Sequence, residues 1–124
     1  MAPVVALSPA ELKDLGVRFF DAMNARDYGA AGDIYAAEAI YESPGLRAPG
    51  RLTGRDNIIR YFTTVLEDDD FQLAILEQFT GVNLVVTRST SEGRTFVDVF
   101  KVNNDAQIVE HLEVAPEASP IDPG

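Results

Sequence analysis

Apolar residues recur at helical spacing over the first stretch of the chain. Ser8, Pro9 and Glu11 have the order of a capping box with proline at the first helical position, which is typical of a helix start. The pattern then predicts a helix that continues to about residue 25. Its apolar face consists of Leu12, Leu15, Phe19, Phe20 and Met23.

Two further helices and a short strand are predicted before the pattern changes. Asp27 can cap a second helix over residues 27–39, whose glycines weaken it. Residues 39–43 have the pattern of a short strand, followed by a loop that leads to a third helix over residues 55–67, with Thr53 as a candidate cap. The buried stripe expected on the third helix consists of Ile58, Tyr61, Phe62 and Val65.

The second half of the chain alternates apolar and polar residues, as strands do. Short turn sequences separate four candidate strands, which lie at residues 71–80, 84–90, 94–102 and 107–115. Consecutive strands joined by short turns predict an antiparallel sheet. Helices followed by such a sheet indicate an α+β fold, in which a curved antiparallel sheet carries three helices on one face and a conical cavity lies between the layers. Such cavities are common ligand sites.

Length, charge and composition exclude several classes of partner and site. A chain of 124 residues predicts one domain, followed by a proline-rich tail over residues 116–124. The net charge of −10 argues against a nucleic-acid partner. The absence of cysteine and the single histidine argue against disulfides and a His- or Cys-based metal centre, so we expect no metal and no cofactor. The start of the chain lacks the pattern of a signal peptide, and no apolar run reaches the roughly 20 residues that span a bilayer, so we expect a cytoplasmic protein without a membrane partner.

Three stretches resemble a known superfamily. They are FFDAMNARDYGAAGDIYAAEAIYESPG from residue 19, LTGRDNIIRYF from residue 52 and FVDVFKVNNDAQIVEHLEV from residue 96. Together they are similar to the nuclear transport factor 2-like superfamily, in its branch of SnoaL-like polyketide cyclases and ketosteroid isomerases. The resemblance implies a cystatin-like, or SnoaL-like, α+β barrel over residues 1–115, often a homodimer. It is specific for the fold and much less so for the reaction, because this superfamily hosts several chemistries.

The resemblance to ketosteroid isomerases is incomplete at the site. The position of their oxyanion-binding tyrosine is occupied by Phe19, and the position of their general base by Ser43. Only their protonated aspartate has a match, at Asp98. A conventional ketosteroid isomerase is therefore not expected.

The resemblance to SnoaL-like cyclases, which use an acid/base aspartate and histidine, implies that Asp98 and His111 form a catalytic pair. Whether they meet depends on the last hairpin. A loop of two or four residues, centred between Asn104 and Asp105, places Asp98 directly opposite His111. A three-residue loop sends the two side chains to opposite faces. Both registers remain open from the sequence.

The expected function is binding of a small, mostly apolar, carbonyl-bearing molecule. Phe19, Tyr35, Tyr41, Ser43, Tyr61 and Phe100 are the candidate binding residues. An aspartate–histidine pair beside a carbonyl could catalyse isomerisation, aldol-type cyclisation or dehydration without a cofactor. The alternative is a non-catalytic binding or dimerisation module of the same fold. An epoxide hydrolase is less favoured, because Arg94 and Asp98 lie four residues apart on one strand, about 13 Å along it.

Overall fold

The computed structural model describes residues 6–43, 50–66 and 71–114. Nine elements follow one another along the chain: α1 (Pro9–Asn24), α2 (Tyr28–Ile34), β1 (Tyr35–Glu42), β2 (Arg51–Thr53), α3 (Arg55–Val65), β3 (Ala74–Gly81), β4 (Leu84–Ser91), β5 (Arg94–Val102) and β6 (Ile108–Val114). The proline-rich tail predicted over residues 116–124 lies outside the described residues, as does the side chain of Val65.

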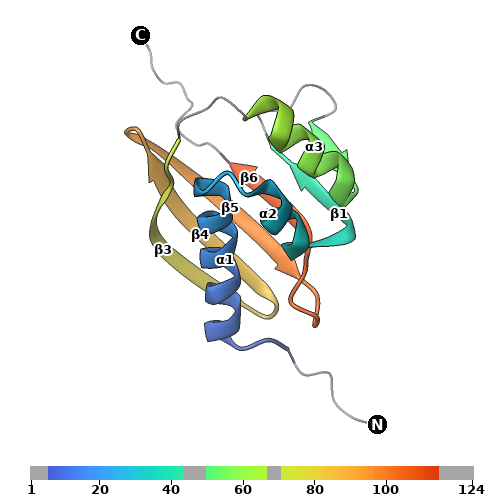
Figure 1. Ribbon diagram of the computed structural model, residues 1–124. Helices are drawn as coiled ribbons and strands as arrows, with labels where there is room; N and C mark the ends of the chain where they lie inside the picture. Colours follow the sequence, from blue (N-terminus) through green and yellow to red (C-terminus); the bar gives the residue numbers. More distant parts are fainter. Residues whose placement is uncertain (1–5, 44–49, 67–70, 115–124) are drawn as a thin grey trace.

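The predicted α+β architecture is confirmed. The three helices lie on one face of a curved six-stranded sheet with the strand order β2-β1-β6-β5-β4-β3 (Figure 1). Helix α1 packs on β3 and β4, whereas α3 packs on β1. The buried apolar side chains form one core between the helices and the sheet. No helix in the described ranges has the length and hydropathy needed to cross a bilayer.

The sheet is mixed, so the expectation of a wholly antiparallel sheet is wrong at one place. Strand β1 runs parallel to β6, and every other neighbouring pair is antiparallel. The chain reaches β6 only after α3 and the three strands that follow it, which gives the long connection that a parallel pair requires. Local alternation of apolar residues carries no information about this non-local pairing.

The second helix is shorter than predicted. It ends at Ile34, and β1 begins at Tyr35 rather than at residue 39. Gly29 and Gly32 lower its helix propensity, and Tyr35 gains a fully buried position paired with Ile108 of β6. The predicted cap is confirmed, because the Asp27 side chain accepts a hydrogen bond from the amide of Ala30.

The segment before α3 also differs from the sequence-based expectation. Arg51–Thr53, predicted as loop, forms the edge strand β2 against β1. The third helix begins after Gly54, not Thr53, because Gly54 occupies the N-cap position with a φ of 96° that favours glycine. At the first helix, by contrast, the predicted capping box of Ser8 and Glu11 is confirmed.

The last hairpin has neither of the registers considered from the sequence. Asn103 donates its backbone N–H to the Gln107 carbonyl, which leaves a three-residue loop that alone would separate Asp98 from His111. Val109 then bulges out of the ladder and shifts the register by one more residue. Together, the loop and the bulge shift the register by two residues from the one that would pair Asp98 with His111. Asp98 therefore pairs with Glu113, and His111 pairs with Phe100. All of these side chains return to the inner face.

Candidate active site

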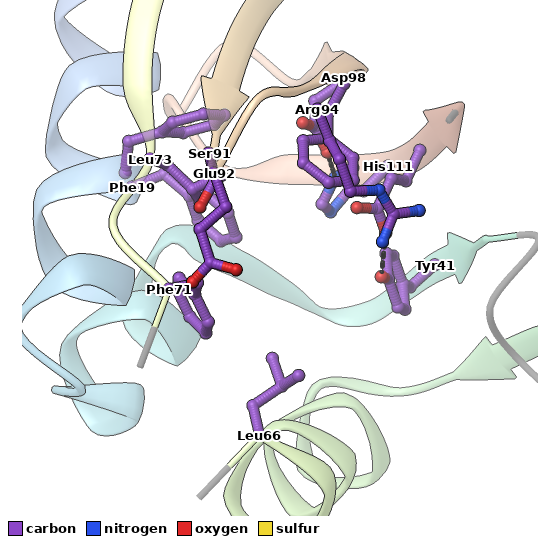
Figure 2. A pocket seen from close by; sticks show the side chains of 13 residues that line it. Phe19, Tyr41, Leu66, Phe71, Leu73, Ser91, Glu92, Arg94, Asp98 and His111 are labelled. Carbon is purple, nitrogen blue, oxygen red and sulfur yellow. Dashed lines mark hydrogen bonds and ion pairs between the residues drawn. The ribbon is translucent and has the colours of Figure 1, made fainter. Parts of the chain in front are cut away.

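A pocket of about 300 Å³ opens between the helices and the inner face of the sheet. In Figure 2, Asp98, His111 and Tyr41 lie toward one side of it and Phe19, Phe71 and Leu73 toward the other. Aromatic and aliphatic side chains dominate the wall. The lining consists of Phe19, Phe20, Tyr41, Leu66, Phe71, Leu73, Ser91, Glu92, Arg94, Phe96, Asp98, His111 and Glu113.

Asp98, His111 and Tyr35 form a continuous chain of hydrogen bonds at the base of this pocket. His111 Nε2 lies 2.6 Å from Asp98 Oδ1, and His111 Nδ1 lies 2.7 Å from the Tyr35 hydroxyl oxygen. The contact is diagonal across β5 and β6, because Asp98 faces Glu113 and His111 faces Phe100 in the ladder. The structure thus brings the aspartate and histidine together, although not through the register that would place them directly opposite each other.

Two proton arrangements with a neutral imidazole satisfy this chain. In one, Tyr35 donates to Nδ1 and the Nε2–H donates to the Asp98 carboxylate. In the other, the protonated Asp98 carboxyl donates to Nε2 and the Nδ1–H donates to the Tyr35 oxygen. Both ring nitrogens of His111 are occupied in either case, so the imidazole has no ring nitrogen left for a ligand. Within this chain of hydrogen bonds, the group available to a ligand is the Asp98 carboxyl, whose Oδ2 has no hydrogen-bond partner within the described ranges.

Burial favours the protonated form of Asp98. Asp98 is 6% exposed and His111 is 3% exposed. Desolvation raises the pKa of Asp98, the nearby His111 opposes that rise, and the charge of Glu113 adds to it. Burial also raises the pKa of Tyr35 well above its ordinary value, so the phenol keeps its proton.

Aromatic rings hold the imidazole in place. The Phe100 ring centroid lies 4.5 Å from that of His111, and the Tyr41 centroid lies 4.7 Å away. Phe19 meets the imidazole edge to face, at 5.5 Å and 85°. This packing fixes the imidazole plane and therefore the direction in which Asp98 is held.

Glu113 is a second carboxylate in the pocket and is not among the site residues predicted from the sequence. The Tyr41 hydroxyl donates to Glu113 Oε1 at 2.6 Å, and the Ser43 hydroxyl donates to the same oxygen at 2.9 Å. Burial, followed by the charge of Glu113, raises the pKa of Tyr41 well above its ordinary value. Alternation along the last strand already places Glu113 on the face of His111, and this was the available signal.

The six candidate binding residues occupy three kinds of position. Phe19 and Tyr41 line the pocket. Tyr35 and Phe100 are fully buried behind it, where they contact His111. Ser43 acts on the pocket through Glu113, and Tyr61 packs its ring 6.1 Å from that of Tyr41 outside the lining.

Arg94 lines the pocket together with both carboxyl groups, which bears on the epoxide hydrolase alternative. Its guanidinium lies 5.5 Å from the centre of the Phe96 ring. Within the part of the chain that the structure describes, it forms no ion pair with Asp98 or Glu113. The arrangement therefore lacks the aspartate–arginine contact that this alternative requires.

Comparison with known proteins agrees with this architecture. A SnoaL-like protein of unknown function from Burkholderia thailandensis is 25% identical, with a TM-score of 0.79 over 86% of this chain and 96% of that chain. A candidate ketosteroid isomerase from Kribbella flavida is 22% identical, with a TM-score of 0.73 over 93% and 84%. A protein with a cystatin-like fold from Methylobium petroleophilum is 17% identical, with a TM-score of 0.77 over 97% and 84%.

The last two likenesses, below 25% identity, show the fold alone, and they confirm the expected cystatin-like class. A comparison with curated proteins found no significant match. The family model of the SnoaL-like domain matches residues 17–111, which is most of the chain. The chain therefore belongs to the SnoaL-like domain family.

Proposed function

We propose that this protein binds a small, mostly apolar, carbonyl-bearing molecule and catalyses proton transfer beside its carbonyl group. The observation that carries the proposal is the buried Asp98 carboxyl, which is held at the base of an apolar pocket by a hydrogen bond of 2.6 Å to His111. A carboxyl that keeps its proton in such a site can donate a hydrogen bond to a developing enolate. Carboxylic acids whose pKa is raised by burial act in this way in other enzymes.

The two members of the pair have different roles in this proposal. Asp98 contacts the ligand and stabilises negative charge on the carbonyl oxygen when an adjacent C–H bond breaks. His111 is a positioning residue, because its nitrogens are occupied by Asp98 and Tyr35. It orients the carboxyl and exchanges a proton with it. Isomerisation, aldol-type cyclisation and dehydration all pass through such an enolate.

Exchange of acidic protons in heavy water tests the proposal directly. We expect the protein to accelerate deuterium incorporation at the α-carbons of 2-tetralone, or of another small cyclic ketone, by at least about 100-fold over buffer. Proton NMR of the ketone gives the rate. We expect 2-naphthol, a planar mimic of the enol, to inhibit the exchange competitively.

The alternative is a non-catalytic binding module. It predicts that 2-naphthol perturbs the NMR signals of Phe19 and Phe71 while no ketone of a small panel exchanges faster than in buffer. Absence of both binding and exchange would contradict the proposed function itself.

We also propose a homodimer formed through the outer face of the sheet. The register aligns Phe79, Val86, Val99 and Leu112 in one apolar row across four strands. Phe79 is 56% exposed and Leu112 is 42% exposed. The charged neighbours of the row are paired within the sheet, Arg88 with Glu77 and Lys101 with Glu110. The charges beside the row thus balance, and a second copy can approach it despite the overall charge of −10.

Replacement of Leu112 by Lys should weaken that dimer at least about 10-fold, because it buries an unpaired charge at an apolar contact. Analytical ultracentrifugation over a concentration series measures the effect. Val82→Lys is the matched control, since Val82 is 85% exposed in the turn between β3 and β4 and outside the row. A wild-type protein that stays monomeric at high concentration would contradict the dimer.

A further inference from the structure

Asp98 and Glu113 form a pair of carboxyl groups on the floor of the pocket. They come from neighbouring strands and stand directly opposite each other in the ladder of β5 and β6. The β-carbons of such pairs lie about 4.5–5.5 Å apart, so both carboxyl groups can reach the same small ligand. Both residues line the pocket.

The two carboxyl groups have opposite environments. Asp98 is 6% exposed and bonded to an imidazole, whereas Glu113 is half-buried and accepts hydrogen bonds from the two hydroxyl groups of Tyr41 and Ser43. Two donors on one oxygen orient the Glu113 carboxylate as an acceptor. Its other oxygen, Oε2, has no hydrogen-bond partner among the described residues, so it is available to a ligand.

Two carboxyl groups whose environments differ in this way commonly act one as an acid and the other as a base. Burial and the charge of Glu113 both raise the pKa of Asp98, which suits Asp98 to hold a proton. The hydrogen bonds from Tyr41 and Ser43 hold the Glu113 carboxylate at the pocket that Asp98 also lines. A carboxylate from β6 is thus placed within reach of a ligand that contacts Asp98.

We propose that Glu113 is the general base that abstracts a proton from the α-carbon of the ligand, while Asp98 is the acid beside the carbonyl oxygen. The inference rests on the proposed function and assigns its substrate class: a ketone or β-dicarbonyl compound with an acidic C–H next to the carbonyl. The C–H bond breaks, its proton moves to Glu113 Oε2 and its electron pair forms the enolate. Asp98 donates a hydrogen bond to the enolate oxygen. In a ketone whose α-carbon adjoins a C=C bond the enolate is a dienolate. Return of the proton from Glu113 to its γ-carbon then shifts the double bond and completes an isomerisation without an oxidant or reductant.

The test compares Glu113→Gln with Glu110→Gln, a matched change on the outer face of β6, away from the pocket lining. The introduced glutamine is isosteric and keeps an oxygen that accepts from Tyr41 and Ser43, so the fold should persist. We expect Glu113→Gln to lower the maximal rate of 2-tetralone deuterium exchange by about 10²–10⁴-fold. We expect 2-naphthol affinity to change less than about threefold, because binding does not require a base. Glu110→Gln should leave both quantities unchanged.

Glu113→Asp provides a second variant, which keeps the base but withdraws it by one methylene. Its exchange rate should lie between those of wild type and Glu113→Gln. Exchange by Glu113→Gln within about threefold of wild type would overturn the assignment of the base and leave the proposed function standing, provided that Asp98→Asn is slow. Wild-type protein that exchanges none of the ketones would instead overturn the proposed function, and the base assignment with it.

Discussion

Asp98→Asn should lower the rate of ketone α-proton exchange by about 10²–10³-fold, because it replaces the acidic donor of an oxyanion site by an amide N–H, which is a much weaker acid. The amide of Asn can still fill the space and hydrogen-bond His111, but it cannot release a proton to a developing enolate. The Asp98 carboxyl lies at the base of the pocket, and its Oδ2 has no hydrogen-bond partner among the described residues. Its loss should therefore affect the maximal rate far more than the affinity.

Two measurements separate this effect from damage to the fold. The affinity for 2-naphthol should remain within about threefold of wild type, and the cooperativity of urea unfolding should be unchanged. Asp105→Asn serves as the matched control, because Asp105 is exposed in the turn between β5 and β6. Retention of most of the exchange activity by Asp98→Asn would show that Asp98 has no chemical role.

The first helix and the extent of strands such as β5 could be predicted because their signals are local. The capping box of Ser8 and Glu11, the apolar face of α1 and the alternation of β5 are each set by residues within a few positions of one another. The start of β1 could not be predicted, because Tyr35 leaves the helical pattern only through its pairing with Ile108, far along the chain. The parallel direction of that pair has the same non-local origin.

The site depended on a detail that composition cannot give. Alternation correctly placed Asp98 and Phe100 on one face, and His111 and Glu113 on one face. Whether these are the same face of the sheet depends on both the three-residue loop and the bulge at Val109. Ala106 adopts a φ of 60° in that loop, a conformation usual for glycine or asparagine, and no sequence rule indicates it there.

Glu113 was missed for a related reason. Counting apolar residues makes Ile108, Leu112 and Val114 look like the buried face of the last strand, and it makes Glu113 look solvated. The structure leaves Leu112 42% exposed and turns Glu113 toward Tyr41 and Ser43. A strand whose outer face contributes to an apolar row reverses the usual rule that charged residues mark the solvent side.

His111→Phe should destabilise the protein by about 3 kcal/mol at neutral or higher pH, at the lower end of the range for breaking a buried pair by removing one partner. Phenylalanine keeps an aromatic ring against Phe19 and Phe100, so packing is largely retained. What is lost are the hydrogen bonds to Asp98 and Tyr35. The remaining carboxyl, 6% exposed, then has no partner for its charge.

The loss should depend on pH, and its sign follows from Asp98. The pKa of that carboxyl is raised from its ordinary value of 3.8 by burial. The stability that it contributes is therefore fully present below about pH 3.8 and is lost as the pH rises through the folded-state pKa. His111 opposes the rise, so its removal moves the folded-state pKa further up and increases the loss. The deficit of His111→Phe should be small near pH 4 and grow steadily toward pH 8.

A double-mutant cycle with Asp98→Asn isolates the pair. In the Asp98→Asn background no buried carboxyl is left without its partner, so His111→Phe should cost at least about 1 kcal/mol less at high pH. Urea unfolding gives the free energies of all four proteins. A fixed protein concentration keeps the contribution of any association to these free energies the same. An equal cost in both backgrounds would mean that Asp98 and His111 touch without stabilising each other, and that the imidazole is held in place by its aromatic neighbours alone.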